Sequence, residues 1–112
     1  PKSVIQEGID AMKKIGSDFM GAESADDLPF AKDDSFVHAL VDGNEYVEQK
    51  MDAMRAHATQ IEVDGPFFAL SNNLGLQVWG YEYYTLVKGE KAEPFDNKGY
   101  EQDLFAGVDI TR

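Results

Sequence analysis

Apolar positions recur every three or four residues in the first part of the chain, which is the spacing of one face of an α-helix. These positions are Ile5, Ile9, Met12, Gly16 and Phe19. Ser3 and Gln6 have the form of a capping box, in which hydroxyl and amide bond to free backbone N–H groups at a helix start. The pattern predicts a helix from Val4 to Met20. A glycine inside a helix costs on the order of 1 kcal/mol, so we expect this helix to depend on tertiary contacts.

Residues 21–34 are acidic, contain Pro29 and show neither a helical nor an alternating period. Such a composition is typical of a loop, and we expect a flexible connector at this point, where a boundary would fall. The chain then divides into an N-terminal helix over 1–20, a connector over 21–34 and a C-terminal segment over 35–112.

A strand-like run and a second helical pattern follow the connector. Ser35–Val41 is apolar and rich in strand-forming residues, and Asp42–Glu45 can form a turn that starts a helix. The apolar stripe of that helix is formed by Val47, Met51, Met54, Ala58 and Ile61. A more polar line with the same spacing lies beside it, at Tyr46, Lys50, Ala53, His57 and Gln60. We expect this line at the edge of the surface on which the helix packs.

The rest of the chain alternates short elements with turns. Pro66–Leu70 is apolar and predicts a strand or an irregular crossing of the core, and Ser71–Asn73 can cap a short helix at Leu74–Trp79. Glu82–Val87 is the clearest strand pattern. Tyr100–Ala106 predicts a final amphipathic turn of helix that stops at Gly107. The fold class predicted by these elements is α/β, in the form of an α+β fragment.

Composition excludes several classes of protein. With 43% hydrophobic residues the chain of 112 residues is too apolar to be intrinsically disordered. A net charge of −11 argues against binding to nucleic acid or anionic lipid. The chain has no cysteine, which excludes disulfides and thiolate chemistry and is compatible with a cytoplasmic protein. No apolar run approaches the roughly 20 residues that span a bilayer.

The chain has few residues suited to metal binding or catalysis. Its two histidines form neither a His-x-x-x-His pair nor a His-Glu-x-x-His motif, and no nucleophile elbow or phosphate-binding loop is present. His38 lies among aliphatic residues, so we interpret it as a structural histidine with one hydrogen bond. We therefore expect no metal site and no catalytic residue within this chain.

The polar line around His57, Thr59 and Gln60 is open to two interpretations. These side chains can end the helix by bonding to its last carbonyl groups. They can also bind a ligand rich in hydroxyl or amide groups, with Tyr46 and Lys50 extending the surface. The chemistry of the residues favours the first interpretation and leaves the second open.

Several runs resemble the C-terminal portion of the LmbE/PIG-L-like zinc deacetylases. They are Lys50-x-x-Ala53-x-x-Ala56-His57-Ala58-Thr59-Gln60, Ala69-Leu70-Ser71-Asn72-Asn73-Leu74, Tyr84-x-Leu86-Val87 and Asp103-Leu104-x-Ala106-Gly107. Within that family the runs are most similar to the actinobacterial mycothiol-pathway branch, which deacetylates N-acetylglucosaminyl-inositol. The mycothiol S-conjugate amidases share the run that ends at Gln60 and are the second choice.

The resemblance implies both a function and a missing part. Family members bind zinc through a His-Pro-Asp-Asp motif and a later His-x-Asp-His-like motif, and neither motif occurs here. The chain is then expected to be a C-terminal segment that packs on a Rossmann-like catalytic core and closes one side of the substrate cleft. Alone it should be inactive and bind no zinc. The first residue is Pro1 rather than Met, which fits a cut or truncated product.

The resemblance also implies roles for the polar line. Gln60 is expected to reach toward the active site, while His57 holds the helix end in place, and Tyr46 and Lys50 are further candidates for the cleft. The expected partner is the missing N-terminal catalytic domain, and the isolated segment should expose an apolar face and self-associate. The alternative is a free-standing acidic module that binds a small ligand or a protein through the same face.

Overall fold

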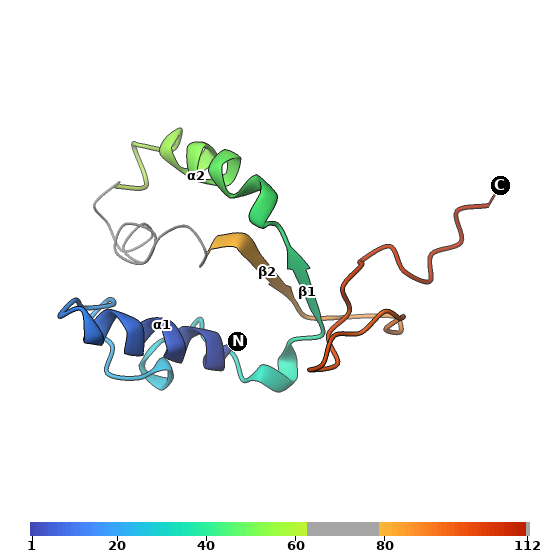
Figure 1. Ribbon diagram of the computed structural model, residues 1–112, viewed down its shortest axis with the longest axis horizontal. Coiled ribbons are helices and arrows are strands. Elements are labelled where there is room, and N and C mark those ends of the chain that lie inside the picture. Colours follow the sequence, from blue (N-terminus) through green and yellow to red (C-terminus); the bar gives the residue numbers. More distant parts are fainter. Residues whose placement is uncertain (63–78, 112) are drawn as a thin grey trace.

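The first element of the fold is the helix α1 at Lys2–Lys14 (Figure 1). The structure is a computed structural model that describes residues 1–62 and 79–111. Ile9 and Met12 are buried on one face of α1, as their spacing predicts. The predicted helix end at Met20 is wrong, because α1 stops at Lys14.

Gly16 ends α1 instead of lying inside it. Its φ of 73° is in the left-handed region, which glycine adopts without the steric cost that a Cβ brings. The backbone N–H groups of Gly16 and Ser17 donate to the carbonyls of Lys13 and Met12, at 3.1 and 2.9 Å. These two bonds form a Schellman motif, which satisfies carbonyls left free at the helix end.

The start of α1 is bonded to a distant part of the chain. The backbone N–H of Lys2 donates to the carbonyl of Lys32 at 2.8 Å, and that of Ser3 donates to Asp34 Oδ1 at 3.0 Å. The predicted capping box is wrong, because Ser3 already lies in the first turn of the helix. Gln6 instead accepts a hydrogen bond from the backbone of Ala25 at 2.9 Å.

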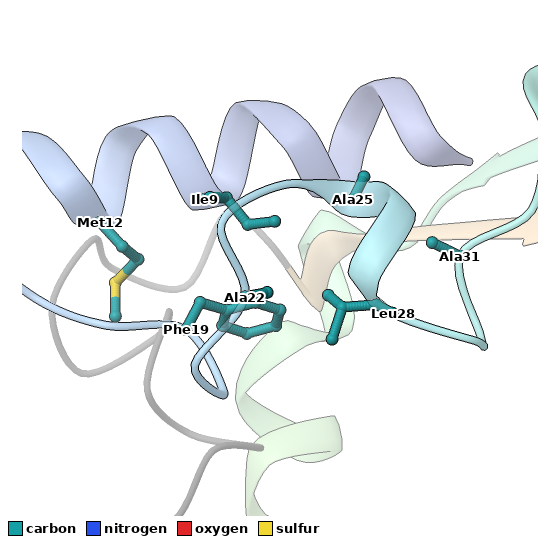
Figure 2. Close-up of a cluster of buried hydrophobic side chains, with 7 residues drawn as sticks. All are labelled: Ile9, Met12, Phe19, Ala22, Ala25, Leu28 and Ala31. Carbon is teal, nitrogen blue, oxygen red and sulfur yellow. The ribbon is translucent and has the colours of Figure 1, made fainter.

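The segment that follows α1 folds back along the helix and completes a small core (Figure 2). It is irregular apart from a short 3-10 helix at Ala25–Asp27. Its buried side chains are Phe19, Ala22, Ala25, Leu28 and Ala31. The stretch expected to be a flexible connector therefore packs on α1, whereas the division of the chain into domains stays a prediction.

Two short strands form an antiparallel pair, β1 at Ala39–Asp42 and β2 at Tyr81–Tyr84, with Ala39 opposite Tyr84. They overlap the two predicted strand runs. His38 lies just before β1, and its Nδ1 accepts a hydrogen bond from the backbone of Leu86 at 2.9 Å. This confirms the interpretation of His38 as a structural histidine. Helices and an antiparallel pair confirm the mixed α/β class, while a Rossmann-like core stays a prediction.

The helix α2 at Val47–Arg55 follows a 3-10 turn at Asn44–Tyr46. Its predicted extent to Ile61 is wrong. Met51 is buried, but Ala58 is exposed together with its neighbours over 55–60. These residues bury no apolar face that would hold a further helical turn, and the backbone continues in turns.

The C-terminal part adds to the free edge of β1. The backbone N–H of Glu101 donates to the carbonyl of His38, and that of Leu40 donates to the carbonyl of Glu101, both at 2.9 Å. The predicted amphipathic helix at Tyr100–Ala106 is wrong. Tyr100 is buried, and the residues after it form turns, with the N–H of Ala106 donating to the carbonyl of Asp103 at 3.1 Å.

Two predicted elements cannot be compared with the structure. Pro66–Leu70 and the cap at Ser71–Asn73 lie outside the described residues, as does the predicted helix at Leu74–Trp79 except for its last residue. Over the described ranges, no helix is long and apolar enough to cross a membrane.

Candidate functional site

The structure divides the predicted polar line between α2 and the turns after it. Tyr46 ends the 3-10 turn before α2 and is 61% exposed, whereas Lys50 lies in the middle of α2 and is half-buried. His57 and Gln60 lie beyond the end of α2 and are exposed. These four residues follow one another along a single stretch of the chain, and among the described residues Lys50 contacts another element through its ion pair and hydrogen bond.

Lys50 connects α2 to the residues at the start of β2. Its ammonium forms an ion pair with the carboxylate of Glu82 and donates to the backbone carbonyl of Trp79 at 3.0 Å. The same Nζ lies 5.7 Å from the centroid of the Trp79 ring, within the range of a cation–π contact. All three contacts turn the charge of Lys50 toward residues 79–82.

The start of α2 lies against the same residues. The backbone N–H of Gly43 donates to the carbonyl of Gly80 at 2.7 Å. A Cβ on Gly80 would lie 1.8 Å from Asn44 Oδ1, so no other residue fits there without movement of Asn44. Asp42 in turn fixes Asn44. The backbone N–H of Asn44 donates to Asp42 Oδ1 at 3.0 Å, and Asn44 Nδ2 donates to the same oxygen at 2.6 Å. These hydrogen bonds from Asn44 lower the pKa of Asp42.

The turns after α2 carry His57 and Gln60. The N–H groups of Ala56 and His57 donate to the carbonyls of Asp52 and Met54, both at 3.0 Å, so the backbone itself closes the helix end. The carbonyl of His57 accepts from the N–H of Gln60 at 2.8 Å. Both side chains are exposed, and an exposed amide and imidazole can donate to and accept from a ligand. Their roles in a cleft stay predictions.

A zinc site does not fit the part of the chain that the structure describes. Over residues 1–62 and 79–111, no three side chains of His, Asp or Glu are grouped closely enough to hold a metal ion. The zinc implied by the family resemblance therefore has no ligand set among these residues, and we assign it no step here.

The contacts of Lys50 involve two residues that sequence reasoning missed. Trp79 and Glu82 lie 29 and 32 positions after Lys50 in the sequence. Periodicity within one helix carries no signal for contacts of that separation. The negative charge of Glu82, in a predicted strand, makes it a possible partner for Lys50. The chain has 21 acidic residues, however, and the sequence does not distinguish Glu82 from the others.

Comparisons with known proteins identify relatives that match nearly the whole chain. It is 54% identical over 110 residues to a protein of Geodermatophilus obscurus named 1D-myo-inositol 2-acetamido-2-deoxy-alpha-D-glucopyranoside deacetylase, covering 96% of this chain and 36% of that protein. Proteins of the same name from Acidothermus cellulolyticus and Mycolicibacterium smegmatis are each 46% identical. Those alignments cover 100% and 96% of this chain and 38% and 37% of the relatives.

The chain thus spans little more than a third of the length of these curated relatives. No protein-family model matches it, and no solved structure matches it. The relatives confirm the predicted resemblance to a segment of the inositol acetylglucosamine deacetylases.

Proposed function

We propose that this chain, which belongs to the family of the 1D-myo-inositol 2-acetamido-2-deoxy-alpha-D-glucopyranoside deacetylases, is the C-terminal part of a zinc-dependent deacetylase of mycothiol biosynthesis. The observation that supports this is an identity of 46–54% to proteins of that name over nearly the whole chain. The reaction would hydrolyse the acetamido C–N bond of N-acetylglucosaminyl-inositol, giving acetate and a free amine. The absence of cysteine is compatible with a reducing cytoplasm, where we propose that the protein acts.

In this proposal the chain closes one side of the substrate cleft and is inactive alone. The zinc ligands and the catalytic base would belong to the rest of the protein, because the His-Pro-Asp-Asp and His-x-Asp-His motifs do not occur here. That remaining part is the proposed partner, and a Rossmann-like core is the fold we propose for it.

Gln60 is the residue that we propose to reach the cleft. Its side chain is exposed beyond the end of α2, and its carboxamide can donate and accept at the same time, as recognition of a sugar hydroxyl or an acetamide requires. His57 lies in the same turn and would hold this helix end in place. Tyr46, exposed at the other end of α2, would border the same cleft.

The test of this role is Gln60→Ala in the full-length protein that contains this chain. A lost hydrogen bond between neutral groups predicts that kcat/KM for deacetylation falls about 3- to 10-fold, with zinc content and thermal stability unchanged. Gln49→Ala is the matched control, because Gln49 is an exposed glutamine on α2 itself. Equal kinetics for the two variants would contradict a role of Gln60 in the cleft.

The alternative is a free-standing acidic binding module. The two proposals predict different coding sequences upstream of this chain. The deacetylase proposal requires an in-frame upstream sequence with a His-Pro-Asp-Asp motif. A coding sequence without that motif would refute the deacetylase and leave the binding module.

A further inference from the structure

We propose that Lys50 is a positioning residue, which acts with Glu82 to hold α2 in the orientation that presents Gln60. This inference rests on the proposed function, because it assumes that Gln60 acts in the cleft. In this role Lys50 affects the reaction by positioning Gln60 and does not contact the substrate.

The charge of Lys50 is already engaged by other residues of the chain. Its ammonium is paired with the carboxylate of Glu82, donates to the Trp79 carbonyl at 3.0 Å and lies over the Trp79 ring. Lys50 is partly buried in this arrangement, where water screens an ion pair less than on an open surface. Leaving these partners to reach a substrate would break all three contacts.

Residues 79–82 hold α2 and the turn before it at two separate places. Just before the helix, Gly43 bonds to Gly80 through the backbone, and Asn44 closes over Gly80. In its middle, Lys50 bonds to Trp79 and Glu82. The two contacts lie at different points along the chain. Together with the burial of Met51, they fix the direction of α2.

The orientation of α2 is transmitted to Gln60 through backbone hydrogen bonds. Beyond Arg55 the chain continues in linked turns, in which the N–H of His57 bonds to the Met54 carbonyl and that of Gln60 to the His57 carbonyl, at 3.0 and 2.8 Å. The N–H of Ile61 bonds to the same His57 carbonyl at 2.9 Å. A tilt of α2 therefore carries Gln60 with it, and small displacements of a group in a site reduce its contribution strongly.

The test begins with Lys50→Ala in the full-length protein, compared with Lys91→Ala. Lys91 is the matched control, because its Nζ also donates to a carbonyl, that of Gly99 at 3.1 Å, and lies 5.5 Å from an aromatic ring, that of Phe95. Both of these partners lie outside α2. We expect Lys50→Ala to lower kcat/KM by no more than Gln60→Ala does, which is about 3- to 10-fold. Equal activity of the two lysine variants would overturn the proposal.

The decisive measurement adds Lys50→Ala to Gln60→Ala. If Lys50 acts through Gln60, the double variant should match Gln60→Ala alone, because nothing remains to be positioned. A merely structural role would lower activity by the same factor in both backgrounds, and that result would overturn this inference while leaving the role of Gln60 intact. No loss of activity in Gln60→Ala itself would overturn the role of Gln60 and this inference together.

Glu82→Gln keeps the size of the side chain and removes its charge, so it tests the ion pair should Lys50→Ala fold poorly. We expect a loss of activity in the same direction and faster hydrogen exchange of the backbone amides over 56–61 in full-length protein. Unchanged activity and unchanged exchange over 56–61 in Glu82→Gln would overturn the proposal.

Discussion

The N-terminal unit, residues 1–34, and the C-terminal arm, residues 85–111, differ in how completely they bury their apolar side chains. In the N-terminal unit, α1 and the segment that follows it bury a continuous cluster around Ile9 and Met12 (Figure 2). In the C-terminal arm, Val87, Phe105 and Ile110 are 93%, 77% and 84% exposed. One region completes its own core, and the other leaves apolar surface in water.

The C-terminal arm is therefore less completely packed than the N-terminal unit. The radius of gyration is 16.1 Å, whereas a compact domain of this length has about 13 Å. Exposed apolar surface of this kind is typical of an interface. The relatives named above are almost three times as long as this chain.

The largest expected effect is on the free energy of unfolding when an isoleucine in each region is replaced by alanine. Ile9→Ala should lower the free energy of unfolding of the chain by about 2–4 kcal/mol, because Ile9 is 1% exposed and the change leaves a cavity. Ile110→Ala should change it by less than about 0.5 kcal/mol. Urea denaturation followed by circular dichroism measures both. Equal losses would show that the arm packs as tightly as the N-terminal unit.

A smaller effect is expected in the association of the isolated chain. The exposed apolar residues of the arm should favour self-association, so the mass obtained from small-angle scattering should rise above that of a monomer with concentration. Val87→Ser with Phe105→Ser should reduce this rise, whereas Met20→Ser, at an exposed methionine outside the arm, should not. A scattering profile that stays monomeric at high concentration would contradict the prediction.

The smallest effect concerns the carboxylates of the two regions. Hydrogen bonding from Ser3 lowers the pKa of Asp34 below 3.8. A lowered pKa in the folded state stabilises the protein above pH 3.8, and this stability is lost as the pH falls through the folded pKa. Asp34→Asn should therefore be less stable than the parent chain at pH 7, and the difference should shrink below pH 3.8.

Asp109 provides the control for that experiment. Its pKa is lowered by hydrogen bonds from Thr111, two residues further along the chain. A bond between near neighbours also forms in an unfolded chain, so Asp109→Asn should leave the free energy of unfolding unchanged at both pH values. A pH-dependent loss for Asp109→Asn equal to that for Asp34→Asn would contradict the comparison. Urea titrations between pH 7 and pH 3 measure both variants.

Periodicity predicted the elements better than their ends. The spacing of Ile9 and Met12 located α1 and its buried face, and the stripe at Val47 and Met51 located α2. The end of α1 depends on two backbone bonds at a left-handed Gly16, which an apolar pattern does not encode. Because the spacing continued, both helices were predicted too long.

The candidate site was predicted from resemblance and only partly from the residues themselves. The spacing of Lys50, His57 and Gln60 predicted one line along a helix, yet α2 ends before His57. The contact that orients α2 joins Lys50 to Glu82 on another element. Such a contact follows from the pairing of β1 with β2, which places residues 79–82 beside the start of α2. No local pattern specifies that pairing.

The central claim is that this chain carries one side of a deacetylase site that is completed elsewhere in the protein. The most direct test measures zinc content and acetate release from N-acetylglucosaminyl-inositol for the 112-residue chain and for the full-length protein. We expect stoichiometric zinc and turnover in the full-length protein and neither in the chain alone. Stoichiometric zinc with turnover by the chain alone would contradict the claim.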